Sequence, residues 1–472
     1  MLRPLFPIGI RRLLPVILCL LSGCASYHAR PLSPADIARN FEQRSLADAG
    51  LRAYMVRALG HDIAPWPPLQ WDRGQLTAAA WYYNPSLELA RAQWQTARAG
   101  IDVASARPNP TLQLPFDYAS PNPGPGAPFT TGPALDIPIE TAGKRGYRIE
   151  QATHLAEAAR LNLDTEAWKV SAQVRDALIA LYAAETRSAS SARHASDEGR
   201  IVAMLRKRMA VGEAARSDVE AATISMRQAQ RDDMSAQTAL NDARAQLAAA
   251  IGVPSSAIAS IRIDTSCLAA APPAHPLADA QREAIFHRSD LLASLADYAA
   301  AESALQLEVA KQYPDIHLGP GYSYDTGTRR IAFGLAGISL PIFDQNQGGI
   351  REAESKREEA AARTSALQDK IIGELDQALT HYRTTLMALH LADEQLATAK
   401  KVLTEQAAGF SVGQTDRLAL TTAKTDYEAK EMSRLDALVA TQQAAAAIED
   451  ALQRPLDQGI VYAPPRRQEQ SR

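Results

Sequence analysis

The sequence contains few aromatic residues and few cysteines. Aromatic residues make up 6% of the chain, and only 3 of its 472 residues are cysteines. The 50 basic and 53 acidic residues nearly cancel, leaving a formal net charge of -3. Few aromatics and abundant alanine favour long helices packed through small side chains over a large core. The balanced charge provides no general surface for a polyanion, so we expect no nucleic-acid partner.

Long apolar runs are also missing, apart from a short one at the N-terminus. Three arginines precede an apolar stretch at 13–21, which ends in L-S-G-C at 21–24. This pattern predicts a secretion signal at 1–23, too short to span a bilayer. Beyond residue 24 no stretch of 18 consecutive apolar residues occurs, so any membrane span must be built from strands.

The cysteines are consistent with an exported chain that has no internal disulfide. The L-S-G-C ending resembles the bacterial lipoprotein box, which implies that Cys24 carries a covalent lipid and begins the mature chain. Ala25, in place of Asp, implies sorting to the outer membrane by the same resemblance. Cys19 would leave with the signal, and Cys267 would have no partner. The alternative is an ordinary secretion signal with an incidental cysteine.

The chain repeats itself at a nearly constant spacing. N-P-S-L-E-L-A at 84–90 matches R-S-D-L-L-A-S at 288–294, and D-I-P-I at 136–139 matches S-L-P-I at 339–342. Pro110 and Pro314 are 204 residues apart, and the two V-G pairs at 211–212 and 412–413 are 201 apart. This spacing predicts two copies of one unit.

Each unit reads as helix, strand, strand, long helix, helix. The predicted segments are an irregular N-terminal wrap at 24–75, a first repeat at 76–254 with strands at about 110–118 and 129–140, a linker at 255–279, a second repeat at 280–455 with strands at about 315–325 and 329–341, and a flexible tail at 456–472. The first helix is expected from Leu76 to Ala106.

Two proline-free stretches, at about 144–208 and 350–410, predict very long helices. About 65 helical residues span nearly 100 Å at 1.5 Å per residue. In the second stretch an apolar seam steps by three and four, as in a coiled coil. Its members are Ile372, Leu375, Leu379, Tyr382, Leu386 and Leu389. Gly212 and Gly413 are expected to end the two helices and reverse the chain.

The strands alternate between apolar and polar residues, which favours a sheet with one apolar face. The aromatics on these strands are interpreted as a lipid-facing surface with interfacial anchors, the alternative being the packed face of a soluble hairpin. They are Tyr118, Phe129, Tyr322, Tyr324 and Phe333. Four strands cannot close in lipid by themselves, so several chains would have to share one barrel and pool their helices into a tube.

The order of elements, the duplication and three motifs resemble the TolC-type outer-membrane efflux family. The motifs are A-R-P-N-P-T-L at 106–112, D-I-P-I-E-T-A-G-K-R at 136–145 and L-P-I-F-D-Q-N-Q-G at 340–348, and they are nearest to the heavy-metal branch that includes CzcC and CusC. The resemblance covers roughly 70–455. It implies a homotrimer with a 12-strand β-barrel and a 12-helix α-barrel. It also implies a periplasmic adaptor (membrane fusion protein), an inner-membrane pump of the resistance-nodulation-division type, and outer-membrane lipid as partners.

The resemblance further implies a gate at the periplasmic end, where the helices reverse. Phe410 matches the aromatic that the family places before the glycine of the second turn. The acidic position that often follows is Ala419 here, so an acidic ring would rest on Asp416 or Asp218. The candidate gate residues are Phe410, Asp416, Arg417, Asp218 and Arg216. The alternative for each is a solvated charge at a helix turn.

No catalytic pattern is found, so we expect no enzyme, no metal site and no cofactor beyond the lipid on Cys24. G-K at 143–144 lacks the upstream glycine and the Ser/Thr of a phosphate loop. His381 and His390 are too far apart on a helix to share a metal at i,i+4. The predicted function is the exit duct of a tripartite efflux pump, for heavy metals by branch resemblance. Alternatives are a multidrug duct, a periplasmic adaptor or structural coiled-coil lipoprotein, and a lipid-anchored enzyme.

Overall fold

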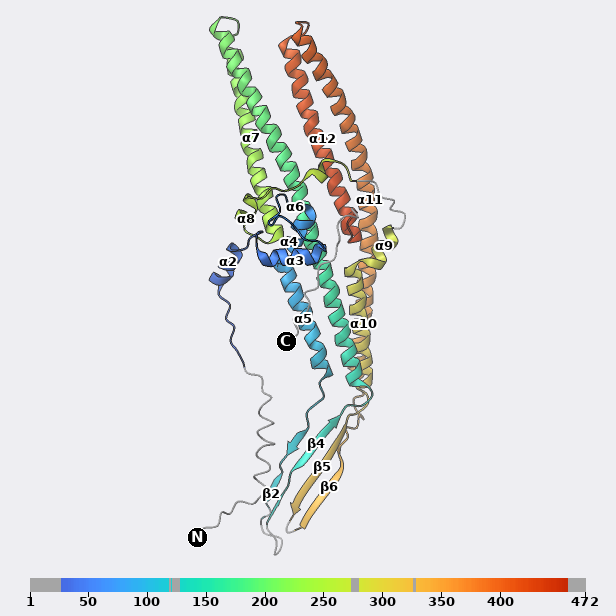
Figure 1. The fold of residues 1–472 in the computed structure, drawn as a ribbon. Coiled ribbons are helices and arrows are strands. Elements are labelled where there is room, and N and C mark those ends of the chain that lie inside the picture. Colours follow the sequence, from blue (N-terminus) through green and yellow to red (C-terminus); the bar gives the residue numbers. More distant parts are fainter. Residues whose placement is uncertain (1–26, 119, 121–127, 273–279, 326–327, 457–472) are drawn as a thin grey trace, which may run out of the picture. The chain divides into compact units, whose positions relative to one another are not determined.

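The protein is described by a computed structural model at residues 27–118, 120, 128–272, 280–325 and 328–456 (Figure 1). The predicted signal, Cys24 and the tail from 457 lie outside these residues. The chain divides into two compact units, Met1–Arg44 and Ser45–Arg472. The described part of the first unit contains helix α2 (Pro34–Glu42), which begins at Ser33, whose side chain accepts a hydrogen bond from the Asp36 N–H.

The second unit is mostly helical and contains the same series of elements twice (Figure 1). In the first half the series is α5 (Pro85–Ser105), β1 (Thr111–Gln113), β2 (Phe116–Tyr118), β3 (Phe129–Thr131), β4 (Ala134–Ile139), α6 (Lys144–Ala210) and α7 (Arg216–Ile251). In the second half it is α10 (Ser289–Ala310), β5 (Ile316–Asp325), β6 (Thr328–Gly337), α11 (Gln347–Ser411) and α12 (Arg417–Leu452). Shorter helices flank these series: α3 (Ala49–Leu59), α4 (Arg73–Tyr83), α8 (Ser255–Ala259), the 3-10 helix η1 (Ser266–Ala269) and α9 (Ala280–His287).

The two long helices, α6 with 67 residues and α11 with 65, end in the same way. At the end of α6 the N–H of Glu213 donates to the carbonyl of Arg208 (2.9 Å), and the N–H of Gly212 donates to that of Met209 (3.0 Å). The α11 end repeats both hydrogen bonds around Gly413 (2.9 and 3.2 Å). Gly212 and Gly413 have φ of 77° and 74°, a conformation that glycine adopts without strain, so each chain reversal depends on its glycine.

The sheet is antiparallel throughout, and one of its edges is broken by prolines. β5 is central: β4 and β3 pair with it on one side and β6 on the other, while β1 and β2 pair with β4 and β3 at one outer edge. The predicted strands at 110–118 and 129–140 are each split in two, at Pro115 and at Gly132-Pro133, because proline cannot donate to the ladder. A Cβ on Gly132 would lie 1.8 Å from the Tyr322 carbonyl oxygen, so this bend requires glycine.

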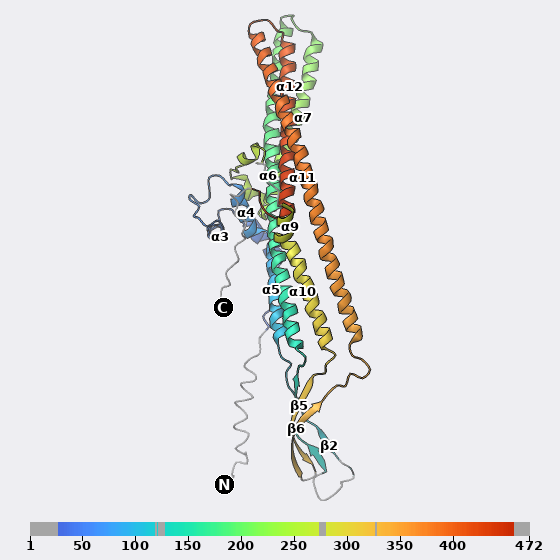
Figure 2. The ribbon, with the colours of Figure 1, turned by 90° about the vertical axis from the view of Figure 1, so that its right-hand side faces the viewer.

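The helices of the second unit lie side by side in pairs. α6 packs against α5, α10 and α7, while α11 packs against α10 and α12 (Figure 2). One apolar core joins α3, α4 and α8 to the middle of α6 and the C-terminal end of α7, and includes Trp71, Leu181 and Leu247. A second core joins α9, α10, α11 and α12 around Ile371 and Leu375. Within the described ranges, no helix is both long and apolar enough to cross a membrane.

Two predicted segments are corrected by the structure. The segment 24–75 is not irregular, because it contains α2, α3 and the start of α4. Asp48 caps α3 and Gly60 ends it, while Leu51, Tyr54 and Met55 are buried against the core. The helix predicted from Leu76 to Ala106 is two helices, since Pro85 begins α5 and the Asn84 side chain caps it by accepting from Ser86 N–H (2.9 Å).

Two further differences concern the second repeat. The strand predicted at 329–341 ends at Gly337, and in the part of the chain that the structure describes no strand pairs with residues 338–341. The buried seam of α11 begins at Ile371 instead of Ile372. Its members are Ile371, Leu375, Ala378, Tyr382, Thr385, Leu389 and Ala392, and the predicted Leu379 and Leu386 pack only partly against it. The predicted and observed stripes share Leu375, Tyr382 and Leu389, and they differ in the positions between these three residues.

Candidate functional site

The candidate gate residues lie in two separate turns. Phe410 lies on the last turn of α11 and is 41% exposed, while Asp416 caps α12 by accepting from the Ala419 N–H (2.8 Å). Arg417 is exposed beside it. The turn is closed by Thr415, whose hydroxyl donates to the Gln406 carbonyl (3.1 Å). Asp416 therefore stabilises the helix start, whatever else it contributes.

The α6/α7 turn carries the other two candidates. Asp218 accepts a hydrogen bond from the Ala215 N–H (3.2 Å), and Arg216 pairs with Glu220 one helical turn later (2.9 Å). In the described residues no hydrogen bond or ion pair joins a side chain of this turn to the α11/α12 turn. One copy of the chain thus brings its five candidates together only in two local groups.

A ladder of ion pairs between α6 and α12, which the sequence analysis missed, links the two helical hairpins. Its four rungs follow an antiparallel register: Arg187 with Asp436, Arg193 with Glu431 (3.4 Å), His194 with Glu428 (3.0 Å) and Asp197 with Lys424. The rungs are partly exposed. The sequence does not show which residues of α6 face which residues of α12. These ion pairs could therefore be recognised only once the register of the two helices was known.

The ladder ends at a buried cluster in the middle of α6. Arg175, with a side chain 4% exposed, binds Asp450 (2.7 Å) and Glu449 (3.1 Å), and Glu449 also binds Arg73 (2.8 Å). Trp168 Nε1 donates to Asp450 (3.0 Å). Burial alone would lower the pKa of Arg175, but the hydrogen bond and charge of Asp450 outweigh it and raise this pKa. Arg175 therefore remains a cation that ties the two repeats together.

The sheet has one apolar and one polar face. Residues paired across the strands share a face, and the five predicted aromatics all lie on the apolar one. Its other members include Leu112, Leu114, Phe116, Leu135, Ile137, Leu318, Ile331 and Leu335. Phe129 packs between Phe116 and Tyr324, with ring centroids 6.1 and 5.8 Å apart.

The polar face carries charged and small side chains. Asp117 pairs across the strands with Thr130, and Ser323 with Arg330. His317 Nδ1 lies 2.9 Å from Asp136 Oδ1 on this face. A sheet that is apolar on one side and polar on the other can separate lipid or protein from water.

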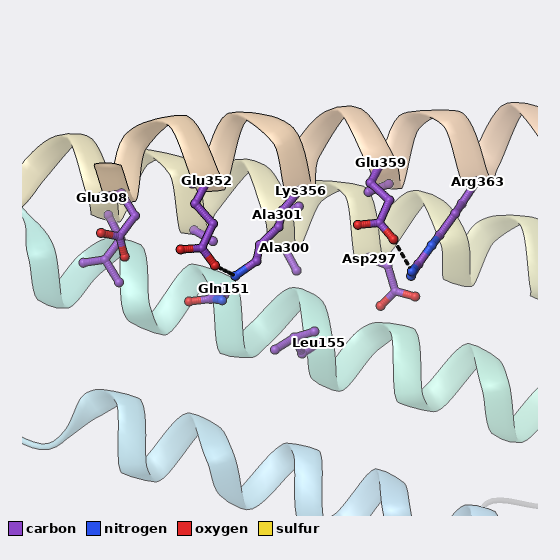
Figure 3. Close-up of a pocket in the computed structure, with 15 residues that line it drawn as sticks. Gln151, Leu155, Asp297, Ala300, Ala301, Glu308, Glu352, Lys356, Glu359 and Arg363 are labelled. Carbon is purple, nitrogen blue, oxygen red and sulfur yellow. Dashed lines mark hydrogen bonds and ion pairs between the residues drawn. The ribbon is translucent and has the colours of Figure 1, made fainter. Parts of the chain in front are cut away.

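A groove between α6, α10 and α11 offers about 590 Å³ of open volume (Figure 3). Alanines of α10 form its floor, and α11 lines it with the ion pairs Glu352–Lys356 (2.6 Å) and Glu359–Arg363. Burial raises the pKa of the Asp297 carboxyl there, against the charge of Arg363. Its lining residues include no serine, threonine, cysteine or histidine, so the groove presents no hydroxyl or thiol nucleophile. Across the described residues, no group of three His, Cys, Asp or Glu side chains could hold a metal ion.

Comparison with known families gives a direct assignment. The family described as outer membrane efflux protein matches twice, at residues 79–253 and 281–453. The chain belongs to this family. The two matched segments coincide with the two structural repeats, so each repeat is one family unit. Efflux proteins of this family are outer-membrane channels.

Individual relatives agree with this assignment. The chain is 26% identical over 429 residues to the cobalt-zinc-cadmium resistance protein CzcC of Cupriavidus metallidurans, covering 90% of this chain and 98% of CzcC. The outer membrane protein VceC of Vibrio cholerae has the same fold, with a TM-score of 0.67, 18% identity, and coverage of 82% and 97%. CusC, described as forming a transmembrane channel, has a TM-score of 0.64, 18% identity, and coverage of 91% and 99%. The predicted membership of the efflux family is thereby confirmed, as is a mainly helical fold with a small strand part.

Proposed function

We propose that the chain is the outer-membrane exit duct of a tripartite efflux pump and catalyses no reaction. The observation that carries this proposal is the pairing of a one-sided apolar sheet with helices of 67 and 65 residues in an efflux-family chain. At 1.5 Å per residue such helices extend about 100 Å, a length suited to crossing a compartment. A periplasmic adaptor and an inner-membrane pump of the resistance-nodulation-division type would deliver the cargo.

The working form of the duct is a homotrimer. Among the described residues of one copy, no further strand pairs with β6 at one edge of the sheet or with β1 and β2 at the other. Free edges are not tolerated in lipid, so copies must complete one another. Three copies would make a 12-strand barrel with the apolar face outward, continued by a 12-helix tunnel. The lipid on Cys24 would add a second attachment to the outer membrane.

The ion-pair ladder supports a gate that opens by separating the two hairpins at their turns. At the buried Arg175 cluster the two hairpins would stay in contact during opening. The ion pairs near Lys424 would break, and the candidate residues in the turns would move apart with them. Exposed ion pairs are each worth about 0.2–1 kcal/mol, so single rungs can break without unfolding the helices.

Lys424→Glu should therefore open the duct more often. The new carboxylate faces Asp197 and Glu428, so the rung becomes repulsive. A change of about 1 kcal/mol corresponds to roughly a fivefold rise in open probability, measured by single-channel recording in planar bilayers. The matched control is Lys430→Glu, whose nitrogen contacts Gln395 inside its own hairpin (3.2 Å) and should leave the currents unchanged. Unchanged currents in Lys424→Glu would show that the ladder takes no part in gating.

The cargo we propose is a divalent metal cation, by analogy with the relative named for cobalt, zinc and cadmium resistance. Deleting the gene in its host should increase sensitivity to these metals, and restoring it should reverse the effect. Sensitivity to drugs alone would make the chain a multidrug duct.

Purified protein that stays a monomer without detergent and conducts no ions would overturn the duct itself. Palmitate labelling that persists in Cys24→Ala would overturn the lipid site.

A further inference from the structure

One histidine and one carboxylate meet on the polar face of the sheet. His317 is the second residue of β5, and Asp136 lies in β4, which pairs with β5. Nδ1 of His317 is 2.9 Å from Oδ1 of Asp136. The two side chains are 39% and 25% exposed, so solvent reaches the pair. Neither residue belongs to the proposed gate or to the apolar face of the sheet.

The pair lies at the end of the sheet that joins the helices. β4 ends at Ile139, shortly before α6 begins, and β5 begins at Ile316, shortly after α10 ends. In the proposed duct the polar face lines the interior of the barrel. The pair would therefore stand where the helical tunnel opens into the barrel, on the route of the cargo.

The strand residues around His317 leave its imidazole accessible. Pro138 and Gly337 pair with His317 across the two neighbouring strands. Gly319 and Gly321 are the next residues of β5 on the polar face. The three glycines have no side chains that could cover the imidazole, which agrees with its partial exposure.

The two donor atoms already have the separation that a single metal ion requires. Zn²⁺ binds an imidazole nitrogen at about 2.0–2.1 Å and a carboxylate oxygen at about 2.0–2.2 Å. Two such ligands that meet the ion at a right angle are about 3 Å apart. The 2.9 Å between Nδ1 and Oδ1 matches this value. A metal cation can thus take the place of the proton between the two atoms, while the neutral imidazole carries its proton on Nε2 instead.

A second histidine–carboxylate pair is less suited to a cation because a lysine lies beside it. In the ladder His194 Nδ1 is 3.0 Å from Glu428 Oε2, and Lys424 Nζ is 3.9 Å from the other oxygen of the same carboxylate. This ammonium repels a further cation. Among the ion pairs of the described residues, Asp136 has His317 as its one partner.

We propose that His317 and Asp136 form a transit site for a divalent transition-metal cation, which they hold together with water. The imidazole nitrogen favours Zn²⁺ and Co²⁺ over Mg²⁺ and Ca²⁺, which prefer oxygen ligands. Two protein ligands bind an ion more weakly than the three or four of a resident metal site. Weak binding suits a duct, because an ion that is held tightly does not leave.

This inference rests on the proposed metal duct and names a place where the cargo contacts it. The matched segments D-I-P-I and S-L-P-I put Ser339 at the position of Asp136 in the second repeat. Counting from the matched Pro110 and Pro314, His317 corresponds to Gln113. Serine and glutamine are weak ligands for transition metals, so each copy supplies one transit site.

Block of single-channel currents by Zn²⁺ tests the site in the full-length protein. Zn²⁺ should reduce the current through the unchanged chain in planar bilayers, and Mg²⁺ at the same concentration should not. His317→Gln and Asp136→Asn should each raise the half-blocking Zn²⁺ concentration by about tenfold or more, because each removes one of two ligands. The control His390→Gln alters an exposed histidine of α11 and should leave the block by Zn²⁺ unchanged.

A rescue variant separates metal binding from a purely structural role of the pair. Asp136→His removes the ion pair but supplies a second imidazole, so block by Zn²⁺ should persist in a variant that still forms SDS-resistant trimers. Loss of block in this variant, as in Asp136→Asn, would make the pair a strand contact only. Block that persists in His317→Gln, or that Mg²⁺ reproduces, would also overturn the transit site.

The same recordings distinguish this failure from failure of the duct. Channels that conduct but do not respond to Zn²⁺ would overturn the transit site and leave the duct in place. An unchanged chain that conducts no ions at all would overturn the duct itself.

Discussion

Phe333→Arg should nearly abolish assembly of the protein in the outer membrane. Phe333 lies in the middle of β6 on the apolar face, opposite Pro320 of β5, and is 76% exposed. If this face contacts lipid, an arginine near the bilayer midplane costs about 2–4 kcal/mol in each copy. In the proposed trimer three copies would carry the change in one barrel, so the penalty would recur. The measurement is the amount of SDS-resistant trimer in outer-membrane fractions, together with the urea concentration needed to unfold the protein in lipid vesicles.

Ala332→Arg is the matched control for this prediction. Ala332 is the preceding residue of the same strand, pairs with Gly321 and lies on the polar face beside Arg330. It gains the same side chain at the same depth, but on the face that would line the interior of the proposed barrel, so its trimer yield should stay near that of the unchanged chain. Equal tolerance of both arginines would favour a soluble hairpin over a membrane sheet.

Much of the architecture could be predicted because the duplication is marked by residues with strong backbone preferences. Gly212 and Gly413 have a positive φ that few other residues adopt, and Pro110 and Pro314 each stand shortly before a strand, so these four residues mark the spacing of the two repeats. The alternation in β5 and β6 likewise predicts which aromatics share a face. The short helix α3 was missed because the prolines at 65–68 dominate the composition of that segment.

The contacts between helices could not be predicted, for a physical reason. A long amphipathic helix offers adjacent stripes, such as those beginning at Ile371 and Ile372, and only the partner helix selects one of them. The α6–α12 ladder depends on a register between residues more than 200 positions apart. The gate residues predicted from the turns are held locally by caps and i,i+4 pairs, and the structure shows the link between the hairpins further along the helices.

Arg175→Met should be the most destabilising single change in the helical part. Removing the cation leaves Glu449, whose side chain is 6% exposed, with Arg73 and the Leu456 N–H as partners, and takes from Asp450 its ion-pair partner. Breaking a buried ion pair on one side costs about 3–5 kcal/mol, because the remaining charge is desolvated without compensation. The midpoint of thermal unfolding, followed by circular dichroism in detergent, should fall accordingly. Arg187→Met, an exposed rung on the same helix, should cost under about 1 kcal/mol.

A double variant separates lost charge from lost packing at this cluster. Arg175→Met combined with Asp450→Asn removes the cation and one of its carboxylates, so part of the stability should return if uncompensated charge is the cause. If lost packing is the only cause, Asp450→Asn should lower the stability further. Because Arg175 joins α6 of one repeat to α12 of the other, its loss should also free the hairpins from each other at their base. We therefore expect Arg175→Met to leak ions even when trimeric, whereas Arg187→Met alters only the frequency of opening. A trimer of Arg175→Met as stable and as closed as the unchanged chain would show that the repeats are held together elsewhere.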